Sequence, residues 1–354
     1  MILFALFIIP IVIAVFSFIF LKGITLKEFL IQLAVQVCVF GIVVGIISCH
    51  NLYYTEILNG QVVKKTRERV SCRHSYQCHC YTTCSGSGKN QSCTKHCQTC
   101  YDHRYDIDWN IYDSTDHVFN IDTEDRQGLI EPKKWTKAAV GDPTARTHQY
   151  KNYIKASSAT LFQKTGLVEK FKKVLPDYPS NVYNYYELNR IITIGYTLKD
   201  SDRWNRQLSF TNGLVGAHKQ CNTILVITKN QPREYKGALE QHWLGANKND
   251  IVLIVNIDDE ENIDWVDIIA LTKTSLFQHE LIDSIVVIKK LDIRKILDQL
   301  QYNIVENYKR KRMRDFEYLQ STIVPTQLQF IISLIISISI AVGLTIFFEI
   351  QDVA

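Results

Sequence analysis

The sequence lacks the motifs of the common catalytic and nucleotide-binding sites. It contains no G-x-x-x-x-G-K-[ST] phosphate loop, no G-x-S-x-G nucleophile elbow and no H-E-x-x-H metalloprotease helix. Its 15 glycines form no dinucleotide fingerprint. The commonest enzyme classes therefore find no support in the sequence, and we expect a protein that binds rather than one that catalyses.

Charge is absent from three long apolar segments. Residues 3–21, 29–48 and 328–348 contain no Asp, Glu, Lys or Arg, and each reaches the roughly 20 residues that span the roughly 30 Å hydrocarbon core of a bilayer. We expect an integral, multi-pass membrane protein with three transmembrane helices, two of them in an N-terminal hairpin (residues 1–49). Because none of the segments carries an ionisable residue, a transporter or channel component is disfavoured.

Two other interpretations of these apolar segments compete with this one. A secretory signal peptide also begins with an apolar run. The first segment, however, has no basic region before it and no small-x-small cleavage site, and a second apolar segment follows almost at once. Buried core helices of a soluble protein are the remaining alternative, but three charge-free runs of this length are rarely core.

Basic residues near the apolar segments predict the orientation, because Lys and Arg are enriched in cytoplasmic loops. The loop after the first segment offers only Lys22 and Lys27. The region between residues 50 and 326 carries more of them near its two ends, namely Lys64, Lys65, Arg67, Arg69, Lys309, Arg310, Lys311, Arg312 and Arg314. This asymmetry predicts that the large region is cytoplasmic.

The basic juxtamembrane segment, residues 309–327, has two interpretations. Its cations contact anionic lipid headgroups, for about 1 kcal/mol each, or they are a plain stop-transfer flank. The net charge of +4 is small and no groove-entering motif accompanies the run, so we expect no nucleic-acid partner. The expected partners are the lipid bilayer and either another protein or a second copy of the chain.

Seven of the ten cysteines lie between Cys72 and Cys100. A stretch this polar cannot build a hydrophobic core, so a covalent or coordinate cross-link must order it. Zinc in a structural role is the first candidate, because the seven cysteines and one histidine would supply the eight ligands of two closed tetrahedral sites. The predicted ligands are Cys72, Cys78, Cys80, Cys84, Cys93, Cys97, Cys100 and His103.

Disulfides and an iron–sulfur cluster are the alternatives to zinc. Disulfides are favoured if the region lies outside the cytoplasm, where thiols oxidise, and an odd number of cysteines leaves one thiol over. Cys93, Cys97 and Cys100 form the C-x3-C-x2-C triad of radical S-adenosylmethionine enzymes. Such enzymes need alternating strands and helices after the triad, whereas the sequence here is polar and strand-like.

The large region divides into two parts by its periodicity. Residues 101–125 alternate apolar and polar side chains in two runs, which predicts two strands joined by a turn at 113–116; they complete a small, Cys-rich β module at residues 50–135. A mixed α/β domain follows at 136–308, with a helix near residue 291 and predicted strands at 190–196, 222–228, 251–257, 265–272 and 285–288. The fold class is thus an α+β and α/β membrane protein.

Part of this second domain resembles the TPM-domain family of thylakoid-lumen and bacterial envelope proteins. The resemblance covers about residues 180–300 and rests on NTILVIT, ALEQHWLGANKND and IVLIVNI, which stand for an apolar strand, a helix with a tryptophan–glycine turn, and a second apolar strand. Two features depart from the family: DDEENIDWVDIIALTK replaces its glycine-rich strand, and its domain normally lies outside the cytoplasm. The resemblance implies phosphatase activity or metal binding, as associated with some members, but transfers no catalytic residue.

An acidic group follows the predicted strand at 251–257, at the end where α/β folds often bind ligands. It is interpreted either as a solvated turn or as a divalent-cation site, and its members are Asp258, Asp259, Glu260, Glu261 and Asp264. Because the sequence has membrane-spanning segments but no complete catalytic motif, we expect a membrane-anchored scaffold or interaction protein. The alternative is a membrane-tethered, metal-dependent hydrolase of the TPM type.

Overall fold

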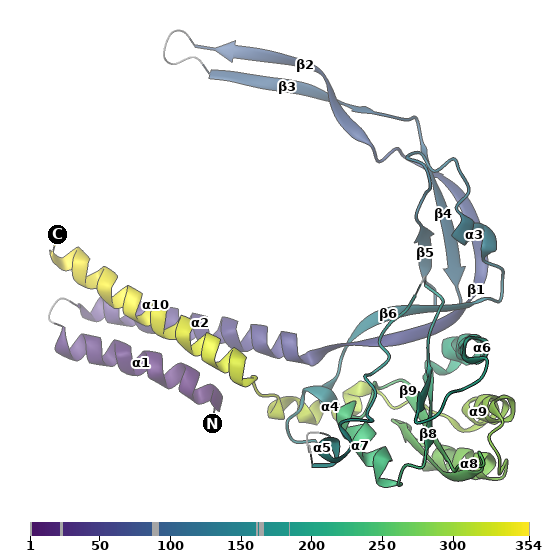
Figure 1. The fold of residues 1–354 in the computed structure, drawn as a ribbon. Coiled ribbons are helices and arrows are strands. Elements are labelled where there is room, and N and C mark those ends of the chain that lie inside the picture. Colours follow the sequence, from purple (N-terminus) through teal and green to yellow (C-terminus); the bar gives the residue numbers. More distant parts are fainter. Residues whose placement is uncertain are drawn as a thin grey trace.

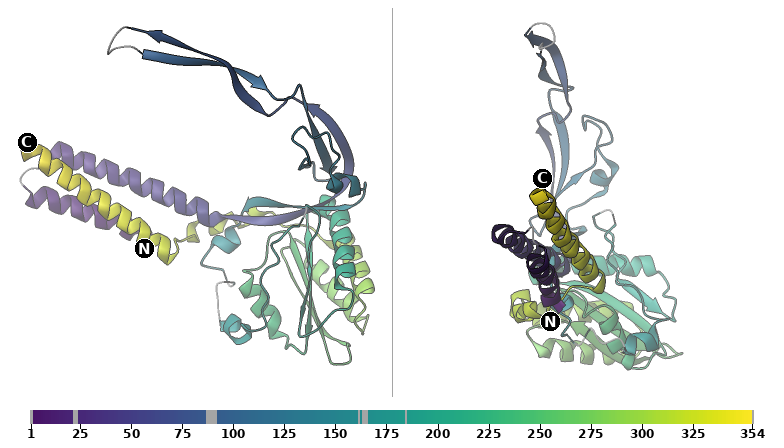
Figure 2. Two further views of the ribbon diagram at one scale, coloured as in Figure 1. Left: turned by 45° about the horizontal axis from the view of Figure 1, so that its top comes forward. Right: turned by 90° about the vertical axis from the view of Figure 1, so that its left-hand side faces the viewer.

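The computed structural model describes residues 2–21, 24–86, 92–160, 162, 166–183 and 185–353. It has three parts: a bundle of apolar helices, a curved β structure that ends in a long hairpin, and a mixed α/β body (Figure 1). The hairpin bends back toward the side from which the helices leave the body, so that the chain has the outline of an open clamp (Figure 1, and Figure 2, left). The mixed α/β class and the Cys-rich β region are as predicted.

Three apolar helices form the bundle: α1 (Ile2–Phe20), α2 (Leu26–Leu52) and α10 (Gln327–Val353). Helix α2 begins with a capping box, in which Thr25 and Glu28 each bond the other's backbone N–H. Two stretches, Leu26–Leu52 and Gln327–Gln351, are long and apolar enough to cross a membrane, whereas the apolar stretch described in α1, Ile8–Phe20, is shorter.

The interior of the bundle contains the polar groups and its exterior the apolar ones. Gln32 is fully buried and donates to the Ala341 carbonyl oxygen at 3.0 Å and to Thr345 Oγ1 at 2.9 Å. Ser17 Oγ lies 3.2 Å from the same Thr345 hydroxyl. One polar cluster therefore joins α1, α2 and α10, while large side chains such as Ile42 point outward and are exposed.

The first sheet begins directly after α2, because β1 starts at the next residue. Strand β1 (Tyr53–Val70) pairs with β6 (Pro143–Lys151) along its first half and with β4 (Asp106–Asp113) along its second half, and β4 pairs with β5 (Val118–Ile121), all antiparallel. A small core forms on β4 around Ile107, Trp109 and Ile111. The predicted strands of residues 101–125 and their turn are confirmed as the β4–β5 hairpin.

The second sheet is the centre of the body and has the strand order β10-β9-β8-β7. Strands β7 (Ile191–Ile194), β8 (Asn222–Lys229) and β9 (Asp250–Ile257) are parallel, and β10 (Ile263–Ala270) is antiparallel to β9. One face packs on α6 (Ser201–Lys219), α8 (Ser275–Val286) and α9 (Ile293–Asn307). The other face packs on α5 (Gly166–Phe171) and α7 (Glu234–His242).

Helix α6 also joins the body to the first sheet, because it packs closely against β1. A Cβ on Gly216 would lie 2.4 Å from the Asn59 carbonyl oxygen, and one on Gly213 would lie 2.7 Å from that of Gly60. Both distances are below any real Cβ contact, so only glycine permits this approach. Nearby, Asn249 Nδ2 donates to the Ile57 carbonyl oxygen at 2.7 Å, which ties β1 to the body through a buried hydrogen bond.

One sequence prediction needs correction. The short strand predicted at 285–288 is wrong, because Ile285 and Val286 end helix α8 and the next residues form a turn. The helix predicted near residue 291 is confirmed as α9, and its apolar face is buried. A 3-10 helix, η3 (Met313–Thr322), separates α9 from α10. The short helices α3 (Lys133–Lys137) and α4 (Tyr153–Ala156) complete the described elements.

Candidate functional site

The Cys-rich stretch forms a two-stranded arm, which consists of β2 (Ser75–Ser85) and β3 (Ser92–Tyr101). None of the residues in these two strands is buried, and all of them are described. Disulfides join three pairs across the arm: Cys78–Cys100, Cys80–Cys97 and Cys84–Cys93. Because two isolated strands are marginally stable in water, the disulfides replace the hydrophobic core that the arm lacks.

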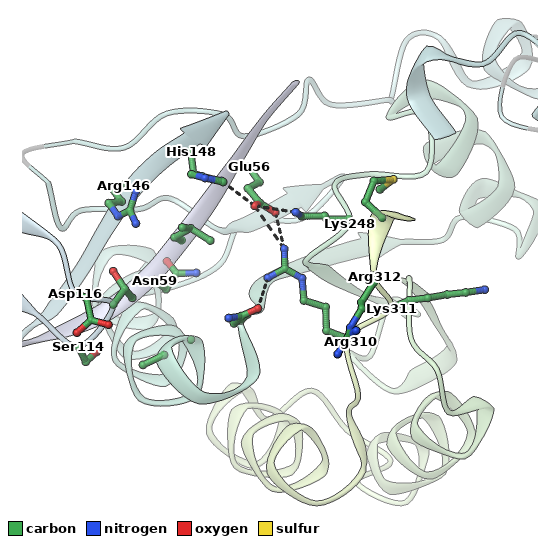
Figure 3. Close-up of a pocket in the computed structure, with 16 residues that line it drawn as sticks. Glu56, Asn59, Ser114, Asp116, Arg146, His148, Lys248, Arg310, Lys311 and Arg312 are labelled. Atoms are coloured by element: carbon green, nitrogen blue, oxygen red, sulfur yellow. Dashed lines mark hydrogen bonds and ion pairs between the residues drawn. The ribbon is translucent and has the colours of Figure 1, made fainter. Parts of the chain in front are cut away.

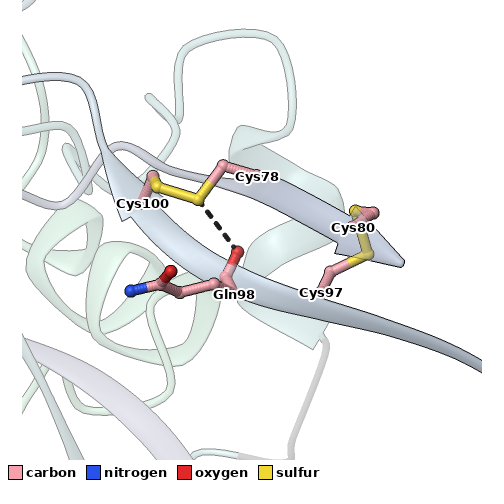
Figure 4. Close-up of a disulfide and its surroundings, with 5 residues drawn as sticks. All are labelled: Cys78, Cys80, Cys97, Gln98 and Cys100. Atoms are coloured by element: carbon pink, nitrogen blue, oxygen red, sulfur yellow. Dashed lines mark hydrogen bonds between the residues drawn. A yellow bond between two sulfur atoms is a disulfide. The ribbon is translucent and has the colours of Figure 1, made fainter. Parts of the chain in front are cut away.

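A β-bulge explains how three disulfides fit on two strands. Side chains alternate along β3, so Cys93 and Cys97 lie on one face and Cys100 on the other. Between Cys78 and Tyr81 the pairing register shifts, and His79 takes a left-handed conformation with φ of 44°. The extra residue of a bulge reverses which face of the strand the following side chains occupy. The cysteines of β2 before and after the bulge can therefore bond cysteines on opposite faces of β3 (Figure 4).

The disulfides change what can be said of the eight predicted zinc ligands. Six of the eight are joined in pairs, and a disulfide sulfur offers no thiolate to a metal. The structure is therefore consistent with the disulfide alternative and does not gather the eight residues into two zinc sites. Cys72 and His103 remain outside the arm's disulfides, and Cys72 Sγ lies 3.8 Å from His103 Nδ1.

A cationic pocket of about 630 Å³ lies where β1, β6, the end of α6 and residues 310–313 meet. Glu56 of β1 is 1% exposed and is the anchor of this pocket. Three basic side chains approach its carboxylate: His148 Nδ1 at 3.0 Å, Lys248 Nζ at 3.3 Å and Arg310 Nη2 at 3.1 Å (Figure 3). Arg310, which belongs to the basic run predicted either to contact lipid headgroups or to be a stop-transfer flank, points inward to Glu56.

Positive charge exceeds negative charge in this pocket. Its lining contains Arg146, Lys248, Arg310, Lys311 and Arg312, against two carboxylates. Burial lowers the pKa of Lys248, although the Glu56 carboxylate opposes that shift. Arg146 lines the opposite wall, and its Nε atom is buried without a hydrogen-bond partner in the described part of the chain. Guanidinium groups bind carboxylates and phosphates, so the pocket is suited to an anion.

The pocket could not be found from the sequence. Glu56 lies near the start of β1, a strand of mixed polar and apolar residues that follows a predicted membrane segment. Its partners lie 92, 192 and 254 residues further along the chain. No short-range pattern signals contacts at such separations. Only the basic run at 309–314 pointed toward this part of the molecule.

The acidic group after β9 forms a hydrogen-bonded turn. Asp258 accepts hydrogen bonds from the Asn262 side-chain amide at 2.9 Å and from the backbone N–H groups of Asn262 and Glu260. These bonds, the side-chain one above all, hold the pKa of Asp258 below its usual range. Asp259 pairs with Lys229 at 3.1 Å, and Asp264 accepts from Asn256 Nδ2 at 3.1 Å. The clusters of potential metal ligands within the described ranges do not include this group, and its carboxylates serve the turn itself.

A buried polar network lies at the start of β9. Asp250 is fully buried and accepts hydrogen bonds from Asn222 Nδ2, the Asn247 backbone N–H and the Tyr178 hydroxyl, at 2.9, 2.7 and 2.8 Å. Burial raises the pKa of Asp250, and the three donors oppose the shift. The carboxylate is enclosed by groups that connect strands to loops, so we assign it to the structure of the body.

Comparisons with other proteins give no relative from which a function could be carried over. No family model matches this chain, and neither a curated protein nor a solved structure matches it.

Proposed function

We propose that this is a membrane-anchored interaction protein whose disulfide-stapled arm binds a protein partner at a membrane surface outside the cytoplasm. The observation that carries the proposal is the arm itself: three disulfides hold β2 and β3 together while no residue of either strand is buried. Three disulfides order this segment, although none of its residues is buried against the described part of the chain. Such a segment is suited to contact another molecule.

The helix bundle supports membrane anchoring. Its buried Gln32, Ser17 and Thr345 bond one another or the backbone inside the bundle, as polar residues do between membrane helices. Its large apolar side chains face outward, for example Val12, Ile42 and Ile335, where lipid would cover them. We include α1 as the third span, because it packs with the other two and shares their polar cluster.

The disulfides support a location outside the cytoplasm. Cytosolic thiols are kept reduced, whereas disulfides form and persist in oxidising compartments. This location is opposite to the one that the basic residues predict, and it agrees with the usual location of TPM domains. Zinc binding at all eight predicted positions would require free thiolates at six cysteines that are joined in disulfides here.

The side chains of the arm suggest the kind of partner. Of the four charged residue types Asp, Glu, Lys and Arg, β2 and β3 contain one residue, Lys95. Their other residues are mainly Tyr, Thr, Ser, Gln and Cys. Tyr76, Tyr81 and Tyr101 are exposed. Rigid aromatic rings beside small hydroxyl and amide groups are typical of surfaces that recognise proteins, whereas nucleic acid and anionic lipid demand basic surfaces.

Site-specific photocross-linking tests the proposal. A benzoylphenylalanine residue at position 81 of the arm should give adducts with a partner protein in intact membranes. The matched control is position 302 in α9, because Tyr81 and Tyr302 are similarly exposed, at 65% and 62%. Adducts at both positions or at neither would contradict a binding role for the arm, and adducts with a second copy of the chain would identify the partner as a homo-oligomer.

A maleimide that does not cross membranes tests the location. We expect labelling of the arm's cysteines in intact cells only after reduction. If labelling required permeabilised cells but no reduction, the region would lie in the cytoplasm. The cysteines would then be free thiols, as the zinc hypothesis requires.

A membrane-tethered phosphatase of the TPM type is the second candidate, and the cationic pocket is the observation that favours it. Arg146 and its neighbours could hold a substrate phosphate, as Arg and Lys do in other proteins. The purified chain should then hydrolyse p-nitrophenyl phosphate in the presence of a divalent cation, and Arg146→Ala should abolish the activity. If replacing Asp258 and Asp259 by Ala abolished it instead, the acidic turn would be the metal site.

A further inference from the structure

The root of the arm contains a cluster of three potential metal ligands. Cys72 follows β1 on the segment that enters the arm, His103 lies on the segment that leaves it, and Asp106 begins β4. Their Sγ, ring nitrogen and carboxylate oxygen atoms all lie within 4.8 Å of one another. Cys72 and Asp106 are buried and His103 is half-buried, so the cluster is screened from bulk water.

The separations match the edges of a tetrahedral zinc site. Zinc binds sulfur at about 2.3 Å and nitrogen or oxygen at about 2.0 to 2.2 Å, so ligand atoms at the tetrahedral angle lie about 3.6 Å (sulfur to nitrogen) and about 3.4 Å (nitrogen to oxygen) apart. Here Cys72 Sγ is 3.8 Å from His103 Nδ1, and His103 Nδ1 is 3.4 Å from Asp106 Oδ1. These two distances would need to change by only a few tenths of an ångström, and the third, between Cys72 Sγ and the Asp106 carboxylate, is within 4.8 Å.

Asp106 provides an independent observation. Its Oδ2 atom accepts a hydrogen bond from the Arg73 backbone N–H at 2.8 Å, which fixes the carboxylate. Its Oδ1 atom is buried, since the residue is only 5% exposed, and accepts no hydrogen bond from the described residues. Its ion-pair contact among them is His103 Nδ1 at 3.4 Å, which is itself one of the three potential ligands. A buried, unsatisfied carboxylate oxygen is costly, and a cation placed between Oδ1, the ring nitrogen and the sulfur would satisfy it.

We propose that Cys72, His103 and Asp106 bind one Zn²⁺ ion at the root of the arm, with a water molecule or an external ligand in the fourth position. A thiolate, an imidazole and a carboxylate are together the donor set that zinc prefers. The Cys72 thiol loses its proton on binding, so affinity rises with pH. The ion fixes the two segments that connect the arm to the sheet, and this site stands whether or not the arm binds a partner.

A second cluster in the arm serves as the internal control. Cys78, His79 and Cys100 also bring their ligand atoms within 4.8 Å, but both sulfurs belong to one disulfide and offer no thiolate. The test is a titration of the full-length protein, in detergent and without reductant, with Co²⁺ as a spectroscopic substitute for zinc. The variants are Cys72→Ser, Asp106→Asn and, as the control, His79→Ala.

We expect one Co²⁺ per chain, with a thiolate-to-cobalt charge-transfer band that Zn²⁺ displaces. Cys72→Ser should remove the band, and Asp106→Asn should weaken binding by at least about tenfold, while its amide oxygen can still accept the Arg73 hydrogen bond and preserve the fold. His79→Ala should change neither. Absence of the band, equal binding by Cys72→Ser and the unaltered chain, or a dimer joined through Cys72 on a non-reducing gel would overturn the proposal.

Discussion

Reduction of the three disulfides should unfold the arm and leave the rest of the chain folded. The arm's strands contain no buried residue, so no hydrophobic contact replaces the cross-links when they are broken. The body, in contrast, has its own core, in which every residue of β9 is buried. The two parts should therefore respond to a reductant independently.

The size of the effect follows from the lengths of the closed loops. The innermost disulfide has a sequence separation of 9 and the outermost a separation of 22. Loop entropy gives about 2.6 and about 3.4 kcal/mol for loops of these lengths. The loops are nested, so these contributions do not add. For the variant with Cys84→Ser and Cys93→Ser, about 2.6 kcal/mol corresponds to a roughly 80-fold increase in the open population near the tip.

Hydrogen exchange of backbone amides, measured by mass spectrometry on the full-length protein in detergent, is the assay. Peptides from β2 and β3 should lose protection by roughly two orders of magnitude near the tip in the double-serine variant, and entirely after full reduction. A peptide from β9 is the internal control and should be unchanged. Protection of the arm that survives full reduction would refute the reasoning, because non-covalent contacts would then hold the strands together.

Three further predictions concern the body and the first sheet. Gly216→Ala should destabilise the chain by about 1–3 kcal/mol, since its Cβ would overlap a backbone oxygen of β1; Gly237→Ala, which meets only the end of a flexible side chain, should not lower the midpoint of thermal unfolding. Glu56→Gln should cost about 1.5–3 kcal/mol in chemical denaturation, because the partly buried side chains of Lys248 and Arg310 lose their carboxylate. The backbone N–H of Ile130 holds the pKa of Asp125 below its ordinary value of 3.8, so its stabilising effect is present above that value and is lost as pH falls through the folded-state pKa. Asp125→Asn should make the acid limb of a stability–pH curve shallower.

Each of these predictions has a result that contradicts it. Equal midpoints for Gly216→Ala and Gly237→Ala would mean that α6 and β1 are further apart than the structure places them. An unchanged denaturation midpoint for Glu56→Gln would mean that the carboxylate is solvated. An acid limb of unchanged slope in Asp125→Asn would show that its loop hydrogen bonds do not persist in solution.

The helices and strands that could be predicted are those in which the buried positions form a regular pattern of apolar residues along the sequence. Strands β8 and β9 are continuous apolar runs because both faces of the sheet are covered, and α9 has one apolar face. Helix α6 was missed for a physical reason. Its buried side mixes Leu208 and Val215 with Ser209, Thr211 and Asn212 beside the glycines that contact β1, so polar residues interrupt its apolar stripe.

The candidate sites were predictable only in part. The number of cysteines showed that a cross-link must exist, but the pairing depends on the bulge at His79, which no spacing rule contains. Asp106 was not among the expected metal ligands, because it was interpreted as part of a polar strand face. The ion pairs of Glu56 join segments far apart in the sequence. Strand pairing places His148 opposite Glu56, and the packing of the body against β1 brings Lys248 and Arg310 to it.

The basic residues that predicted a cytoplasmic large region have other partners in the fold. Lys65 lies 4.1 Å from the centre of the Trp135 ring, Arg69 lies 4.7 Å from that of Tyr105, and Arg310 pairs with buried Glu56. Lys65 is also thirteen residues beyond the end of α2 on an extended strand, which is roughly 40 Å at about 3.3 Å per residue. Cation–π contacts and an ion pair therefore account for these charges without a membrane surface. The disulfides have no such second explanation, and for this reason the proposed location outside the cytoplasm rests on them rather than on the basic residues.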